Sequence, residues 1–138
     1  MSSNGNGNGN GQHGYAFNRT RQTFLATRLR IANTHLARLR GLLGTPRKNF
    51  EFGQGLLIVP CHGVHTLAMS YPIDVVYLDR HHRVLHVEEN VKPWRFAPMR
   101  MQAVSVLELP CHTAWDTQTA VGDHIEIRLG PAHSTPRR

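Results

Sequence analysis

The sequence predicts a small α+β domain whose mainly antiparallel sheet curls toward a barrel. Six segments of strand length are either alternately or continuously apolar. The middle strands are joined by short connections, which antiparallel pairing permits. No strand–helix–strand unit repeats, which argues against a doubly wound parallel sheet. The expected order is a strand, a helix, four strands, a short helix and a final strand.

The 138 residues are enough for one domain. Alternating Asn and Gly residues near the start cannot bury apolar surface, so residues 1–19 are expected to form a disordered tail. Residues 131–138 are expected to form a second, flexible tail. A single domain is therefore expected over residues 20–130.

The first strand and the first helix are expected between residues 23 and 44. Residues 23–31 alternate between apolar side chains and polar or arginine side chains, as in a half-buried strand. Asn33 or Thr34 would cap a short helix. Gly44 stands in a stop position, and Pro46 prevents the helix from continuing.

The remaining elements alternate with turn residues. Two of the strands flank a four-residue turn at residues 79–82 and are expected to form a hairpin. A short helix is expected over residues 112–119. The remaining strands are expected at residues 55–59, 73–78, 83–88, 103–109 and 123–129.

The basic residues are unevenly distributed. The formal net charge is +7, yet no acidic residue precedes Glu51, and residues 51–136 hold nine acids against six bases. Such a basic segment could contact the phosphate backbone of a nucleic acid. The aromatic residues that single-strand binding uses are not interleaved with it, so a solvated arginine face is preferred. The side chains concerned are Arg28, Arg30, Arg38 and Arg40.

No targeting or membrane signal is recognisable. No apolar run approaches the ~18 residues of a membrane span, and residues 1–14 lack the apolar core of a secretory signal. Cys61 and Cys111 are therefore expected to be free thiols in a reducing compartment. We expect a cytoplasmic protein without membrane contact.

A polar loop between two apolar strands is the main candidate site, because loops held by a rigid scaffold often carry function. No complete catalytic set is present, so the leading hypothesis is a non-catalytic binding or accessory domain. Its partner would be a small ligand or another protein. The candidate binding residues are Cys61, His65, Thr66, Met69, Asp74, Trp94 and Arg95.

Zinc binding is one alternative. The tripeptide Pro-Cys-His occurs at residues 60–62 and again at 110–112, each time after an apolar strand. If those strand ends were adjacent, Cys61, His65 and Cys111 could hold a zinc ion. The spacing matches no zinc finger, so no cofactor is predicted.

An enzyme is the other alternative, with Cys61 as the thiolate, His65 as its base and Asp74 as the orienting carboxylate. Asp74 interrupts an apolar strand, and a carboxylate there needs partners. We prefer a structural interpretation, in which Asp74 accepts hydrogen bonds from the preceding loop. Glu108 also interrupts an apolar strand, and it is expected to pair with an arginine such as Arg40 or Arg95.

Several short motifs follow one another along the chain: Arg40-Gly41-Leu42-Leu43, Gly55-Leu56-Leu57, Cys61, Val64-His65-Thr66, Met69, Pro72-Ile73-Asp74-Val75, Leu78-Asp79, Val84, Pro93-Trp94, Val106-Leu107-Glu108-Leu109 and Gly122-Asp123. In these motifs the chain resembles the bacterial and archaeal family known as domain of unknown function 192. The resemblance implies a small, mainly β, α+β domain, but it implies no activity because the family is uncharacterised. Cys111-His112 departs from the small residue and glycine usual in the family, which weighs against zinc.

Overall fold

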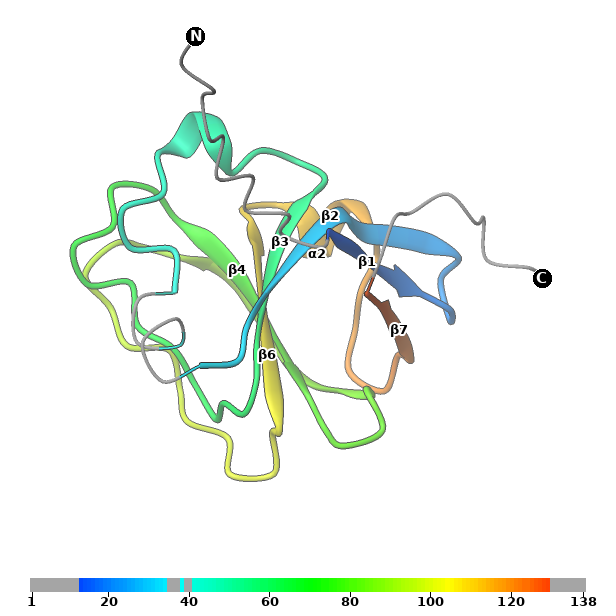
Figure 1. Cartoon of the computed structure of the whole chain (residues 1–138). Coiled ribbons are helices and arrows are strands. Elements are labelled where there is room, and N and C mark those ends of the chain that lie inside the picture. Colours follow the sequence, from blue (N-terminus) through cyan, green and yellow to red (C-terminus); the bar gives the residue numbers. More distant parts are fainter. Residues whose placement is uncertain (1–12, 35–37, 39–40, 130–138) are drawn as a thin grey trace, which may run out of the picture.

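Seven strands form one sheet in the order β5-β4-β6-β3-β2-β1-β7 (Figure 1). The structure is a computed structural model that describes residues 13–34, 38 and 41–129. Only β2 and β3 pair in parallel, and the other neighbours are antiparallel. The elements are β1 (Gly14–Asn18), β2 (Thr23–Ala32), η1 (Arg47–Asn49), β3 (Gln54–Ile58), β4 (Ile73–Leu78), β5 (Val84–Val91), β6 (Ser105–Pro110), α2 (Thr113–Asp116) and β7 (Ile125–Arg128).

The sheet curls until its two edge strands, β5 and β7, meet at one corner. The Val84 N–H donates to the Asp123 carbonyl at 2.9 Å, and the Ile125 N–H donates to the His82 carbonyl at 2.9 Å. These bonds join the start of β5 to the start of β7. The predicted α+β, barrel-like fold is confirmed, with the addition of one parallel strand pair.

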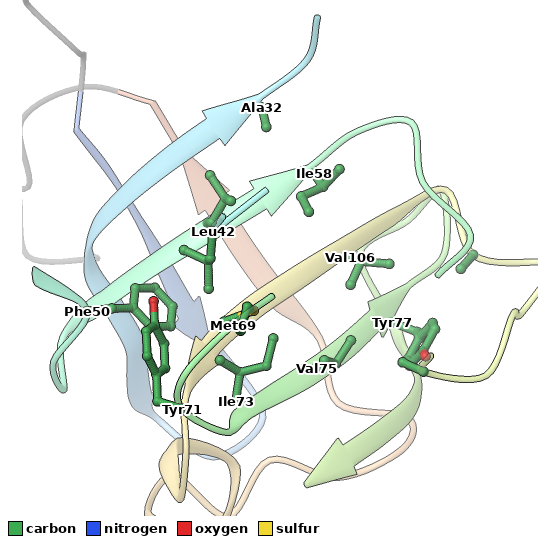
Figure 2. Packing of buried hydrophobic residues seen from close by; sticks show 13 residues of the cluster. Ala32, Leu42, Phe50, Ile58, Met69, Tyr71, Ile73, Val75, Tyr77 and Val106 are labelled. Carbon is green, nitrogen blue, oxygen red and sulfur yellow. The ribbon is translucent and has the colours of Figure 1, made fainter. Parts of the chain in front are cut away.

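Each face of the sheet carries its own apolar cluster, because successive strand residues point to opposite faces. The cluster on the concave face includes residues of both end strands of the sheet, such as Val84 and Ile125. The cluster on the other face includes Ile73, Val75 and Val106 (Figure 2). This second face is covered by loops rather than by another layer. Leu42, Phe50, Met69 and Tyr71 from those loops close it.

The boundary of the predicted N-terminal tail at residue 19 is wrong. Strand β1 lies inside that segment, is buried along its length, and pairs with both β2 and β7. Asn18 ends the strand, and its Nδ2 donates to Asp123 Oδ2 at 2.9 Å. One of the two neighbouring strands, β2, is close in sequence, whereas β7 is more than 100 residues away and that contact cannot be read from local patterns.

The other elements follow the sequence prediction with shifted bounds. Asp79 accepts the N–H groups of His81 and Arg83 in the predicted hairpin turn. Strand β5 runs three residues further than expected, and the last helix shrinks to Thr113–Asp116. The Arg38 N–H donates to the Thr34 carbonyl as in a helix, and residues 35–37 and 39–40 of the first predicted helix lie outside the described residues. The predicted helix end at Gly44 is wrong, because residues 41–44 form a turn that begins at Gly41, whose φ is +50°.

Among the described residues, no helix has both the length and the apolar character that crossing a bilayer requires.

Candidate functional site

The loop that follows β3 is fixed along its length to the loop that precedes β6. The Cys61 N–H donates to the Val104 carbonyl, and the Arg100 N–H donates to the His62 carbonyl, each at 2.9 Å. The Ala97 N–H donates to the Val64 carbonyl, also at 2.9 Å. The polar loop is therefore part of a scaffold with defined geometry.

Thr66 is the centre of this attachment and is fully buried. Its hydroxyl donates to the Lys92 carbonyl at 2.6 Å and accepts the Arg95 N–H at 3.0 Å. Its carbonyl accepts the Trp94 N–H at 2.9 Å. All its polar groups are thus used inside the protein, which makes Thr66 a structural residue rather than a ligand contact.

Below this loop lies a cavity of about 120 Å³. Three of the predicted binding residues, Cys61, His65 and Met69, line it together. The cavity lies on the face of the sheet that the loops cover. Two of its lining residues, Met69 and Leu42, belong to the cluster drawn in Figure 2. The further lining residues that bear on its chemistry are Arg38, Gly41 and Glu108.

Glu108 supplies a buried carboxyl group to this cavity. Glu108 stands on β6, which lies between β3 and β4 in the sheet. It pairs with Leu56 of β3 on one side and with Val75 of β4 on the other. Its side chain is 2% exposed, and its Oε2 has no hydrogen-bond partner among the described residues. Burial raises the pKa of this carboxyl to about 8, so it is mostly protonated at neutral pH.

The expected pairing of Glu108 with an arginine is not found among the described residues. The Arg95 guanidinium instead donates to the Trp94 carbonyl at 3.3 Å. Arg40 lies outside the described residues. Within the described part of the chain, the carboxyl therefore borders the cavity with one oxygen unsatisfied, which is costly in a buried position.

Gly41 leaves room over that carboxyl. Its φ of +50° is in the left-handed region, where glycine is favoured. A Cβ atom at this position would stand 3.7 Å from both carboxylate oxygens of Glu108. The absence of a side chain at Gly41 thus keeps open the space above the acid.

Cys61 is not an activated nucleophile in this arrangement. Its thiol donates to the Gly63 carbonyl at 3.0 Å. Burial raises its pKa, and the nearby Glu108 carboxyl adds to that, whereas the bond to Gly63 and the Arg38 charge act in the opposite direction. Among the described contacts, His65 makes no hydrogen bond to Cys61, and its Nδ1 accepts the Leu67 N–H at 3.3 Å. A thiolate–imidazole pair is therefore not formed.

Asp74 does not belong to the cavity. Its two carboxylate oxygens accept the N–H groups of Asn90 and Ala114, each at 2.9 Å, and the side chain is fully buried. The preferred structural interpretation is right about the role of Asp74 but wrong about its partners. They lie at the end of β5 and in α2, not in the preceding loop.

Trp94 and Arg95 do not line the cavity either. The Trp94 side chain is 63% exposed, and its backbone has a φ of +62°. Both residues reach Thr66 through backbone groups: each donates its N–H to Thr66, and the Arg95 carbonyl also accepts the Thr66 N–H at 2.8 Å. Of the seven predicted binding residues, the structure thus gathers three in one cavity and leaves four outside it.

Cys61 and Cys111 lie at opposite ends of β6. The Cys61 N–H bonds to Val104, just before the strand, whereas Cys111 directly follows its last residue. The Cys111 thiol donates to Asn90 Oδ1 at 3.3 Å. The strand ends proposed to converge on zinc are therefore apart. Within the described ranges, no three His, Cys, Asp or Glu side chains are grouped as metal ligands.

The four arginines of the basic segment do not share one environment. Arg28 and Arg30 are exposed on β2, whereas Arg38 is half-buried and lines the cavity. Arg40 lies outside the described residues.

The residue that sequence reasoning missed as part of the site is Glu108. The available signal was the same as for Asp74, an acid inside an apolar strand. Two-residue periodicity places Glu108 on the same face as Val106, but only the covering loops show that this face holds a cavity.

Comparison with known proteins gives the family. The sequence profile of domain of unknown function 192 (DUF192, described as "Uncharacterized ACR") matches residues 16–127. This chain belongs to that family. A UPF0127 protein from Thermococcus sibiricus is 29% identical to it over 114 residues, covering 79% of this chain and 71% of the relative.

Two solved structures share the DUF192 fold seen here. A protein of unknown function from Novosphingobium aromaticivorans superposes with a TM-score of 0.69 and 18% identity, covering 83% of each chain. A protein from Sinorhizobium meliloti, whose description proposes a transcription regulator, gives a TM-score of 0.68 and 17% identity. That match covers 83% of this chain and 92% of the other. At these identities the likeness concerns the fold alone.

Proposed function

We propose that this DUF192 protein is a small, non-catalytic binding domain that takes a ligand group of a few atoms into the cavity beside Glu108. One observation carries the proposal. A buried carboxyl with an unsatisfied oxygen borders a cavity of about 120 Å³. An engineered cavity of about 150 Å³ holds benzene, so this one suits a group of about five non-hydrogen atoms.

The chemistry of the lining supports binding rather than catalysis. The Cys61 thiol is occupied by Gly63, His65 does not contact it by a hydrogen bond, and Asp74 belongs to the other face. The proposal needs no cofactor. We also propose a cytoplasmic location, because both cysteines are free.

A ligand screen by thermal shift tests the proposal. The library holds amines, amides, alcohols and carboxylates of four to six non-hydrogen atoms. At least one class should raise the Tm of the wild-type protein and fail to do so in Gly41→Ala, whose new methyl group would contact the Glu108 carboxyl. Gly122→Ala is the matched control, since its φ is also positive and nothing lies within 4 Å of its Cβ position. If no class raises the Tm, the proposal is wrong.

Nucleic-acid binding is a second candidate, favoured by the exposed Arg28 and Arg30 on β2. The description of the Sinorhizobium meliloti protein as a proposed transcription regulator points the same way. Such binding should weaken steeply with salt and with Arg28→Gln/Arg30→Gln. A gel shift at low ionic strength measures it, and the absence of any shift there would exclude it.

A further inference from the structure

The inside of the cavity offers acceptors for hydrogen bonds. Oε2 of Glu108 is buried and has no hydrogen-bond partner in residues 13–34, 38 and 41–129. Met69 and Cys61 add sulfur atoms, which are weak acceptors, and the Cys61 S–H donor is already used by the Gly63 carbonyl. A ligand rich in hydrogen-bond donors would complement these acceptors.

We infer that the group bound in this cavity is a primary ammonium at the end of an unbranched alkyl chain, whose N–H groups donate to the Glu108 carboxylate. The inference rests on the proposed function and names its ligand class. A cation is the strongest partner for a desolvated carboxylate, because charge-assisted hydrogen bonds are roughly twice as strong as neutral ones. The alkyl stem would lie against Ile58, Leu42 and Met69, which line the same cavity.

Binding of this group is coupled to the ionisation of Glu108. In the empty cavity burial keeps the carboxyl mostly protonated below pH 8. An ammonium ion stabilises the ionised form, so each bound ligand should release close to one proton at pH 7. The apparent affinity should then rise roughly tenfold from pH 6 to pH 7 and about fivefold from pH 7 to pH 8, where the carboxyl is half ionised.

Other titratable or charged groups also face this carboxyl. Arg38, Cys61 and His65 line the cavity, and Tyr71 is close enough for the Glu108 charge to raise its pKa. The thiol and the phenol stay neutral below pH 8, because burial raises both pKa values. Arg38 is the group that would favour the competing ligand class, a carboxylate, since this basic residue also lines the cavity.

Four probes of similar size decide between these classes. n-Butylamine is compared with 1-butanol, butyramide and butyrate by calorimetric titration at pH 6, 7 and 8, in buffers of different ionisation enthalpy. We expect n-butylamine to bind best, with proton release, and Glu108→Gln to weaken it by roughly 10- to 100-fold. Nα-Acetyl-lysine methylamide is titrated in parallel. Its binding shows whether the ammonium group can come from a lysine side chain or only from a free alkylamine.

The possible outcomes distinguish a failure of the ammonium inference from a failure of the proposed binding function. Equal binding of 1-butanol and n-butylamine, unchanged in Glu108→Gln, would overturn the ammonium class and leave the binding function standing. Tighter binding of butyrate, weakening as the pH rises, would also overturn it. Binding of no probe at all would overturn both proposals. Gly41→Ala, which keeps the acid but fills the space above it, should abolish n-butylamine binding if the site is this cavity.

Discussion

Asp74 and Glu108 stand on adjacent strands, one step apart in register, and their side chains point to opposite faces of the sheet. Val75 pairs with Glu108, and Asp74 pairs with Leu109. Both carboxyl groups are buried, yet Asp74 has two backbone N–H partners whereas Glu108 has an oxygen with none among the described residues. The first acid is a structural anchor, and the second faces a cavity.

Asp74→Ala should destabilise the protein by about 2–3 kcal/mol, because two buried N–H groups, of Asn90 and Ala114, lose a charged acceptor. Asp116→Ala is the control, since Asp116 is exposed. Urea unfolding of both variants measures the difference. If the urea midpoint of Asp74→Ala equals that of the control, the two hydrogen bonds to Asp74 contribute nothing to the free energy of unfolding.

Glu108 should make the protein less stable as the pH rises from about 5 to 8. Its folded pKa, about 8, lies above the ordinary value of 4.5, so in this window the folded state holds a proton that the unfolded state has released. The resulting loss is at most about 1.4 kcal/mol per pH unit.

Urea unfolding of the wild type and of Glu108→Gln at pH 5, 6, 7 and 8 measures this effect. The glutamine variant keeps the side-chain shape but cannot ionise. Its stability relative to the wild type should therefore grow with pH and level off above pH 8. A constant difference across this range would mean that Glu108 is not buried as described.

Thr66→Val should cost about 1–3 kcal/mol and loosen the loop that precedes β6, because the Lys92 carbonyl and the Arg95 N–H lose the hydroxyl that joins them. Hydrogen exchange should accelerate at the Trp94 and Ala97 amides. Thr27→Val on the exposed side of β2 is the control. If exchange at those two amides is unchanged, the Thr66 hydroxyl does not hold this loop in place.

Cys61 should react slowly with alkylating reagents at pH 7. Burial raises its pKa, so the thiolate fraction falls below the ~3% of an ordinary cysteine. Mass spectrometry of native Cys111→Ser after timed exposure to iodoacetamide follows Cys61 alone, and unfolded protein provides the reference rate. Fast, stoichiometric labelling of the native protein would restore the hypothesis of a Cys61-dependent enzyme.

Strand patterns and turn residues were enough to predict the β4–β5 hairpin and the half-buried β2, because these depend on contacts close in sequence. The strand β1 is missed although β2 is close in sequence, because its five residues GYAFN show no clear alternation and directly follow the Asn/Gly-rich segment. Its partners are β2 and, more than 100 residues away, β7. The predicted short helix at residues 112–119 was too long, since its C-terminal part is shaped by packing around Asn18 and Asp123.

The sequence by itself determined the fold class, the family and the loop that borders the site. Local patterning and a run of characteristic residues specify these features. Only the tertiary structure decided which side chains meet. Strand register sends Asp74 and Glu108 to opposite faces, and the length of β6 keeps Cys61 and Cys111 apart. The cavity exists because loops fold over one face of the sheet. These segments are far apart in the sequence, so no local pattern predicts their contact.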